Sequence, residues 1–191
     1  MLLYIHGFNS SPLSDKAKET ADYIKQRFPD YPFHQPQLPS SPKAAMTLLC
    51  GIVEQAKAKG EPLTYIGSSL GGYFASYLAE QYGGKAVLIN PAVKPFELFD
   101  GFLGPQYNPY TDEHYQVLPQ HKLDVAEYNT EVIRRPDRFL VFLQTGDEVL
   151  DYRQALSKYH CCQLHLEANG DHSFIGYNNQ LDKICDFLQI K

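Results

Sequence analysis

The sequence lacks three features that would place the protein in a broad class at once. No apolar run approaches the length of a transmembrane helix, and lysine and arginine are scattered without forming a basic cluster. The net charge of −5 and the pI of about 5.8 also argue against a nucleic-acid-binding protein. The first residues, Met1–Ile5, have neither the positive charge nor the long apolar stretch of a secretory signal. These absences predict a cytoplasmic protein with no membrane span and no nucleic-acid partner.

Cysteine is scarce, and its spacing excludes the usual metal motifs. The four residues are Cys50, Cys161, Cys162 and Cys185, and no pair has C-x-x-C spacing. A zinc site is therefore not expected. We expect all four thiols to be reduced and mostly buried as small hydrophobic side chains. The sequence predicts neither a metal nor a cofactor.

The 191 residues are 43% hydrophobic and 20% charged, which is typical of one globular domain spanning residues 1–191. Short apolar runs alternate with segments that have a helical period. The predicted strands are 2–5, 33–38, 63–66, 86–89, 139–143 and 163–166. The predicted helices begin at Ser11-Pro12 and Ser41-Pro42 or cover 70–82, 151–159 and 180–188. Pro36 places the second strand at a sheet edge. The alternation predicts an α/β fold with a mostly parallel sheet of about six strands and helices on both faces.

One long segment interrupts this alternation. Residues 91–136 are rich in phenylalanine, tyrosine and proline and show no clear strand pattern. A long insertion in a compact α/β domain is usually a functional cap or lid. We therefore predict an aromatic-rich cap at about residues 93–136.

The strongest local motif is a G-x-S-x-G sequence that lies between a predicted strand and a predicted helix. It is formed by Gly67-Ser68-Ser69-Leu70-Gly71, and a further glycine follows. In this context the motif indicates a nucleophile elbow, whose tight turn raises the central serine above the sheet at a helix N-terminus. The simpler interpretation is a glycine-rich turn without chemistry. Ser69 is the predicted nucleophile, and Ser68 occupies the variable position.

A carboxylate follows the predicted strand 139–143. Asp147 lies in Thr145-Gly146-Asp147-Glu148, beyond a carboxyl end that reaches the same sheet edge as Ser69. Such a group can accept the N–H of a histidine and fix its tautomer. Glu148, Asp151 and Asp171 are the rival carboxylates. We favour Asp147, because Asp151 is better placed to cap the next helix.

A histidine lies in the loop between the last predicted strand and the last predicted helix. His172, in Gly170-Asp171-His172-Ser173-Phe174, follows the acid loop in sequence and is the predicted general base. A histidine is more often structural than catalytic, so its position must decide. Six other histidines lack this context: His6, His34, His114, His121, His160 and His165.

A further motif lies in the loop after the first predicted strand. In His6-Gly7-Phe8-Asn9, the main-chain N–H of Phe8 is predicted to form an oxyanion hole with that of Leu70, the residue after the nucleophile. His6 is predicted to shape this loop. The order Ser, Asp, His along the chain is that of α/β-hydrolases and differs from chymotrypsin-like and subtilisin-like proteases.

These motifs together resemble the YqiA family of small bacterial esterases within the α/β-hydrolase superfamily. The resemblance is carried by Leu3–Pro12, Tyr65–Tyr73, Asn90-Pro91-Ala92, Gln144–Tyr152 and Gly170–Phe174, and it covers essentially the whole chain. It implies a compact cytoplasmic esterase acting on carboxylic esters and acyl thioesters, with acyl-CoA as one candidate substrate. The family's triad corresponds to Ser69, Asp147 and His172.

The sequence leaves the substrate open. An amide or carbon–carbon bond hydrolase would use the same triad, and a non-catalytic binding protein is a further alternative. We expect Phe96, Phe99 and Phe102 of the cap to line a substrate pocket, with Leu103, Tyr107 and Tyr110 as further candidates. The alternative is that these side chains only cover one end of the sheet.

Overall fold

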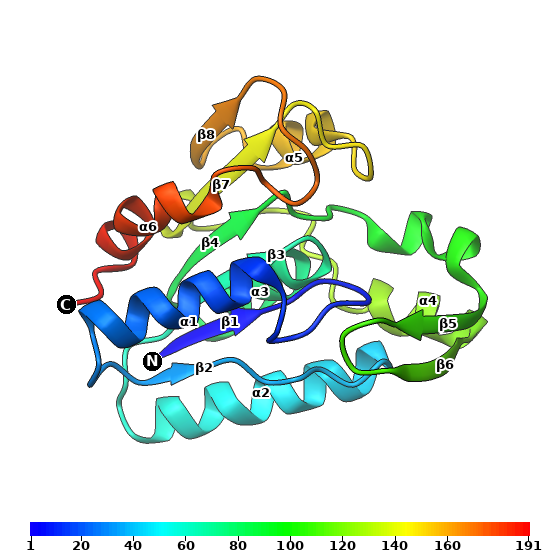
Figure 1. Cartoon of the computed structure of the whole chain (residues 1–191), viewed down its shortest axis with the longest axis horizontal. Helices are drawn as coiled ribbons and strands as arrows, with labels where there is room; N and C mark the ends of the chain where they lie inside the picture. The colour runs from blue at the N-terminus through cyan, green and yellow to red at the C-terminus, as the bar shows by residue number, and fades with distance from the viewer.

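The computed structural model describes residues 1–191 and contains one central sheet covered on both faces by helices (Figure 1). The sheet strands are β1 (Leu2–Ile5), β2 (Phe33–His34), β3 (Thr64–Ser68), β4 (Lys85–Ile89), β7 (Phe139–Gln144) and β8 (Gln163–Glu167). They are all parallel and lie in the order β2-β1-β3-β4-β7-β8. The predicted α/β fold with a six-stranded, mostly parallel sheet is confirmed.

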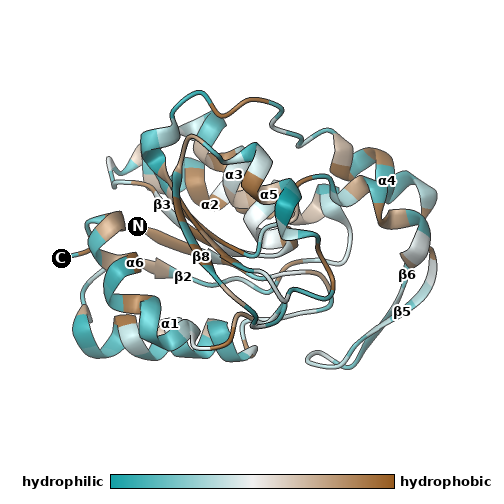
Figure 2. Ribbon diagram, turned by 90° about the horizontal axis from the view of Figure 1, so that it is seen from above, coloured by the Kyte–Doolittle hydropathy of each residue, from teal (hydrophilic) through white to brown (hydrophobic).

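Six α-helices accompany the sheet: α1 (Asp15–Arg27), α2 (Pro42–Ala58), α3 (Leu70–Tyr82), α4 (Pro119–Ala126), α5 (Tyr152–Lys158) and α6 (Leu181–Leu188). Figure 2 shows α1 and α6 on one face of the sheet and α2, α3 and α5 on the other. Leu2 and Tyr4 of β1 pack into the core below α1 and α6, whereas Leu3 and Ile5 pack into the core on the opposite face. The sequence of such a strand is apolar at every position because successive side chains alternate between two buried layers.

Two predicted boundaries differ in the structure. Helix α1 begins at Asp15, not directly after Ser11-Pro12, because the Ser11 hydroxyl accepts a bond from the Leu13 N–H (2.9 Å) in a local turn. Strand β2 covers only two residues, at the sheet edge that Pro36 indicates. Helix α2 starts at Pro42 as predicted, with the Ser41 side chain accepting from the Ala44 N–H.

The cysteines are free, but most are less buried than predicted. Cys185 is buried, Cys50 and Cys162 are half-buried, and Cys161 is exposed. The prediction fails for Cys161 and Cys162 because they precede β8 in a turn and do not belong to the strand. No helix of the chain combines the length and the apolar character that a membrane crossing requires.

The segment 93–136 contains more structure than its sequence predicts. It holds two short 3-10 helices, η1 (Pro95–Glu97) and η2 (Phe99–Phe102), followed by an antiparallel hairpin of β5 (Gly104–Asn108) and β6 (Glu113–Val117), and then by α4. Most hairpin residues are exposed or half-buried, so no apolar alternation marks the two strands. The hairpin extends away from the main sheet beside α4 (Figure 1).

Candidate active site

Ser69 occupies a tight turn between the central strand β3 and helix α3. Its backbone has φ 56° and ψ −121°, a conformation that typically costs about 1–3 kcal/mol for a residue with a side chain. The turn is held in place because the Ser69 N–H donates to the Ile89 carbonyl (3.0 Å) and the Ala92 N–H donates to the Ser69 carbonyl (3.1 Å). A Cβ on Gly71 would lie 2.0 Å from the Ile5 carbonyl oxygen, so the turn tolerates only glycine there. The geometry is that of the predicted nucleophile elbow.

Three predicted side chains meet at the carboxyl edge of the sheet. His172 Nε2 lies 3.0 Å from Ser69 Oγ, and His172 Nδ1 lies 2.8 Å from Asp147 Oδ2. With Nδ1–H donating to the carboxylate, Nε2 is left to accept the serine hydroxyl proton. The side chain of Asp147 is 2% exposed. The structure therefore brings Ser69, His172 and Asp147 into one hydrogen-bonded chain.

Asp147 is held ionised by its partners. Burial alone would raise the pKa of its carboxyl group, but the hydrogen bonds from His172 and from the Leu150 N–H outweigh that effect and lower the pKa. The Val149 N–H also donates to Oδ1 (2.9 Å). An ionised acid at this place stabilises a protonated His172.

The rival carboxylates have other partners. Glu148 accepts from the main-chain N–H of His172 (2.9 Å), and Asp151 caps α5 by accepting from the Arg153 N–H (3.0 Å). Asp171 accepts from the Ser173 hydroxyl (2.5 Å). Among the four candidates, only Asp147 bonds the imidazole ring of His172.

Two buried amides that sequence reasoning did not assign a role hold the His172 loop. Asn90 follows β4, is 2% exposed, and donates from Nδ2 to the carbonyls of Asp171 (2.9 Å) and His172 (3.3 Å). Its Oδ1 accepts from the Gln144 N–H (3.0 Å). A polar residue directly after a fully apolar strand is the signal that could have identified it.

Gln144 completes this support from the neighbouring strand. It ends β7 and is 3% exposed. Its Oε1 accepts from the N–H groups of Asp171 (3.1 Å) and Ile175 (2.9 Å), and its Nε2 donates to the Ile175 carbonyl (2.8 Å) and to Glu167 (2.8 Å). We refer to Asn90 and Gln144 as the amide pair. Because both side chains use their donors and their acceptors, they fix the loop that carries the imidazole.

The loop after β1 lies against the nucleophile. A Cβ on Gly7 would be 3.7 Å from Ser69 Oγ, so the absence of a side chain leaves space beside the hydroxyl. The buried His6 donates from Nδ1 to the Gly7 carbonyl (2.9 Å) and accepts at Nε2 from the Leu38 N–H (3.1 Å). Burial lowers the pKa of His6, which keeps this bridging ring neutral. His6 therefore shapes the loop, and its ring nitrogens are engaged away from Ser69.

The two residues whose N–H groups are predicted to form the oxyanion hole lie beside Ser69. The Phe8 N–H has no hydrogen-bond partner within the protein. The Leu70 N–H belongs to the first residue of α3, where a helix leaves its N–H groups without intrahelical partners. Phe8 and Leu70 both border a cavity that also contains Ser69.

Two cavities with different chemistry open at Ser69 and His172. The apolar cavity has a volume of about 210 Å³ and is bordered by cap residues that include Leu98, Phe99 and Phe102. The polar cavity has a volume of about 450 Å³. Its polar lining includes Ser10, Ser14, Lys16, Glu19, Tyr110 and Glu148. The site can therefore hold an apolar group on one side of the serine and a hydrogen-bonding group on the other.

The six residues predicted to line the pocket lie in different parts of the structure. Phe99 and Phe102 line the apolar cavity, whereas Phe96 packs against the hydrophobic core. Tyr110 borders the polar cavity, and Tyr107 stacks on His114 with ring centroids 4.8 Å apart. Leu103 is exposed.

A family model matches almost the whole chain. The match covers residues 1–189, and its description is "Uncharacterised protein family (UPF0227)". The chain belongs to this family. This match confirms the resemblance to the YqiA family that the sequence motifs indicate.

Solved structures share the fold of this UPF0227 member. A monoacylglycerol lipase from Paleococcus ferrophilus has a TM-score of 0.71 at 12% identity, covering 97% of this chain and 94% of the lipase. Alpha/beta hydrolase domain-containing protein 10 from mouse has a TM-score of 0.70 at 14% identity, covering 98% and 89%. Est1E from Butyrivibrio proteoclasticus, in a structure with bound ferulic acid, has a TM-score of 0.67 at 14% identity, covering 98% and 87%. At these identities the similarity shows that the chain has the α/β-hydrolase fold.

Proposed function

We propose that this UPF0227 protein is a serine hydrolase that cleaves carboxylic esters or acyl thioesters, with acyl-CoA among the candidate thioesters. The observation that carries the proposal is the hydrogen-bonded chain from Ser69 through His172 to Asp147, with the serine raised on a strand–helix elbow. The fold shared with esterases and lipases supports it.

In the first step, Ser69 Oγ attacks the acyl carbonyl carbon while its proton moves to His172 Nε2. The carbonyl oxygen gains a negative charge, which the N–H groups of Phe8 and Leu70 stabilise. The bond from the carbonyl carbon to the alcohol oxygen or thiol sulfur then breaks. The leaving group takes the proton from His172, and an acyl group remains on Ser69.

In the second step, water replaces the leaving group. His172 accepts a proton from the water as its oxygen attacks the acyl carbon. The bond to Ser69 Oγ breaks, Ser69 regains its proton from His172, and the carboxylic acid departs. Asp147 stabilises the imidazolium in both steps without taking up the proton.

We divide the proposed substrate between the two cavities. We place the acyl group in the apolar cavity, where Leu98, Phe99 and Phe102 of the cap provide the wall. The leaving group then lies in the polar cavity, whose hydroxyl and charged side chains suit a hydrogen-bonding alcohol or thiol. In this proposal, residues 93–136 act as a cap of the single domain 1–191.

The proposed setting is a reducing compartment such as the cytoplasm. All four cysteines are unpaired, as is usual for proteins of compartments that keep thiols reduced. The proposed partner is a small-molecule ester or thioester.

The test is the hydrolysis of p-nitrophenyl butanoate by the wild type and by Ser69→Ala, with Ser68→Ala as the matched control. We expect kcat to fall about 10⁶-fold in Ser69→Ala because the nucleophile is lost, and to stay within a few-fold of wild type in Ser68→Ala. Labelling with a fluorophosphonate probe should disappear in Ser69→Ala alone.

Three results would contradict the proposal in whole or in part. Equal activity of the wild type and Ser69→Ala would show that another group is the nucleophile. A wild type that neither hydrolyses esters or thioesters nor reacts with the probe would exclude the serine hydrolase. A wild type that cleaves only amides would replace the ester assignment.

A further inference from the structure

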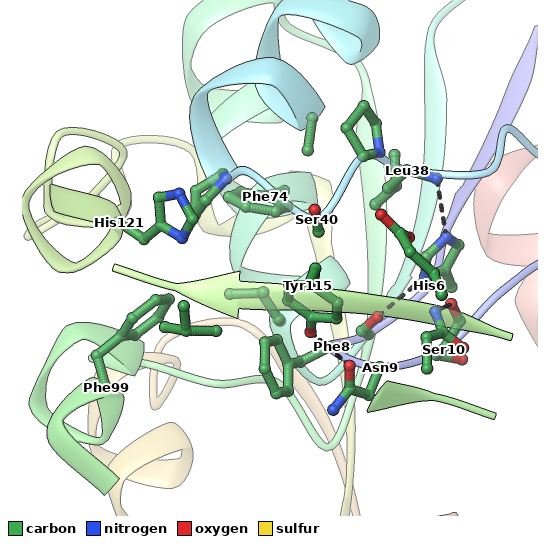
Figure 3. A pocket seen from close by; sticks show the side chains of 18 residues that line it. His6, Phe8, Asn9, Ser10, Leu38, Ser40, Phe74, Phe99, Tyr115 and His121 are labelled. Carbon is green, nitrogen blue, oxygen red and sulfur yellow. Dashed lines mark hydrogen bonds between the residues drawn. The ribbon is translucent and has the colours of Figure 1, made fainter. Parts of the chain in front are cut away.

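A third cavity adjoins the apolar one. It lies between the loop after β1, the start of α2 and the β5–β6 hairpin, and its volume is only about 40 Å³ (Figure 3). Phe8, Leu70 and Phe99 border both cavities. We call it the rear cavity, because it does not contain Ser69.

The phenyl ring of Phe8 forms the wall between the two cavities. It packs on Phe102 of the apolar cavity with ring centroids 5.2 Å apart. It also packs on Tyr115 of the rear cavity, with centroids 6.4 Å apart (Figure 3). Phe102 borders only the apolar cavity, and Tyr115 borders only the rear one. Phe8, Leu70 and Phe99 therefore lie between the two spaces, and Phe8 is the one whose ring contacts an aromatic ring of each cavity.

The rear cavity is suited to an apolar chain even though polar residues border it. The Tyr115 hydroxyl donates to Asn9 Oδ1, Asn108 Nδ2 donates to the Ser10 carbonyl (3.0 Å), and His6 accepts from the Leu38 N–H. These groups would keep their partners if hydrocarbon filled the space, and the Glu113 side chain, which also borders it, is exposed to solvent. The apolar wall consists of Leu38, Ala45, Leu70, Phe74, Phe99 and Val117.

The size of the apolar cavity limits what it holds. A buried apolar cavity of about 150 Å³ binds benzene, so by the same measure about eight carbon atoms fit within 210 Å³. A longer acyl chain must leave the cavity, and its route passes the exposed side chains of Leu98 and Phe102. The chain cannot continue inward because the Phe8 ring closes that direction.

We propose that the side chain of Phe8 sets the acyl-chain length that this enzyme prefers, by separating the acyl cavity from the rear cavity. The inference rests on the proposed function. It gives Phe8 two independent tasks, because its main-chain N–H faces the oxyanion and its ring ends the acyl cavity. Removing the ring would open space for about six further carbon atoms, in addition to the rear cavity itself.

The test compares Phe8→Ala with Phe102→Ala. Both variants remove one phenyl ring from the apolar cavity, but only Phe8→Ala opens the rear cavity. The readout is kcat/KM for p-nitrophenyl decanoate divided by that for p-nitrophenyl butanoate, because any change at the oxyanion hole affects both esters alike. We expect this ratio to rise about tenfold or more in Phe8→Ala, since two extra methylene groups become buried, and to rise less than threefold in Phe102→Ala.

A substitution that fills the rear cavity supplies the converse measurement of the ester ratio. Ser40 is half-buried and borders the rear cavity. Adding Ser40→Phe to Phe8→Ala should refill the rear cavity and return the ratio toward the wild-type value. Should Phe8→Ala fail to fold by thermal melting, Phe8→Leu tests the same ratio with a smaller expected rise.

The outcomes separate this inference from the proposed function. Active variants whose ratio is unchanged in Phe8→Ala, or rises equally in Phe102→Ala, would overturn the role of Phe8 and leave the serine hydrolase intact. A persistent rise in the Phe8→Ala, Ser40→Phe double variant would also overturn it. A wild type that hydrolyses neither these esters nor thioesters, and does not react with the fluorophosphonate probe, would instead overturn the proposed function.

Discussion

At the residue scale, the chemistry of the site depends on one buried carboxylate and its partners. Asp147 bonds the His172 ring and two main-chain N–H groups, and these bonds offset the cost of burying its charge. The three rival carboxylates do not bond the imidazole ring. Glu148 and Asp151 bond main-chain N–H groups, Asp151 also bonds the Arg153 guanidinium, and Asp171 bonds a hydroxyl. A single residue therefore decides the tautomer of the proposed base.

Replacing that carboxylate by an amide tests this role. We expect Asp147→Asn to lower kcat on p-nitrophenyl butanoate by about 10⁴-fold, because the amide favours the wrong tautomer of His172. Glu148→Gln is the matched control and should lose far less, since Glu148 bonds only the main chain of His172. Equal losses in the two variants would contradict the assignment.

The lowered pKa of Asp147 also predicts a dependence of stability on pH. A carboxyl group whose folded-state pKa is depressed stabilises the fold above its ordinary pKa, and this contribution is lost as pH falls through the depressed value. The melting temperature of wild type should therefore fall on acidification below about pH 4. Asp147→Asn should show a shallower fall over the same range, and parallel curves for the two proteins would refute this.

At the scale of elements, the ends of β4 and β7 position the loop that carries His172. The amide pair, Asn90 and Gln144, bonds the main chain on both sides of His172. Neither amide touches the imidazole ring, so both act as positioning residues. Asn90 also adopts φ 39°, which asparagine tolerates better than most residues.

Replacing the Nδ2 donor of Asn90 tests this positioning role. Asn90→Asp keeps the shape but cannot donate to the carbonyls of Asp171 and His172, and it buries a negative charge near them. We expect kcat to fall by about 10²-fold with KM nearly unchanged, because a misplaced base affects the chemical step more than binding. The fluorophosphonate labelling rate should fall in parallel. A rise in KM at constant kcat would instead indicate a role in substrate binding.

At the scale of the whole molecule, the cap is joined to the sheet domain by buried bonds. The Tyr73 hydroxyl of α3 donates to the Val125 carbonyl of α4 (2.7 Å), and Ser76 bonds the Thr130 hydroxyl (3.2 Å). All four residues are buried. These contacts indicate that residues 119–130 unfold together with the sheet. The hairpin is joined to the loop after β1 instead, through the bond from Asn108 Nδ2 to the Ser10 carbonyl (3.0 Å).

Tyr73→Phe tests this joint unfolding. It removes the Tyr73 hydroxyl bond, but the Val125 carbonyl keeps its bond from the Tyr128 N–H (3.2 Å). The expected loss is therefore about 0.5–1.5 kcal/mol, which lowers Tm by a few degrees. We expect calorimetry to show one transition, with kcat nearly unchanged. Tyr107→Phe in the exposed hairpin is the matched control and should leave Tm where it is. A separate, earlier transition in Tyr73→Phe would show that the cap unfolds by itself.

The sequence by itself determined the features that depend on local pattern. Strands buried on both faces are apolar at every position, and the strand–glycine–serine–glycine–helix order specifies the elbow at Ser69 without reference to distant residues. The sequence also predicted that Ser69, Asp147 and His172 lie close together. Each follows a predicted strand, and parallel strands bring their carboxyl ends to one edge of the sheet.

Only the tertiary structure decided the features that depend on residues far apart in the chain. These features are the bond that selects Asp147, the contacts of the amide pair, the packing of Phe96 against the core and the place of Phe8 between two cavities. The β5–β6 hairpin also escaped prediction because its exposed strands carry no alternating pattern. Local sequence encodes periodicity and turn chemistry, whereas distances between distant loops depend on how the helices pack on the sheet.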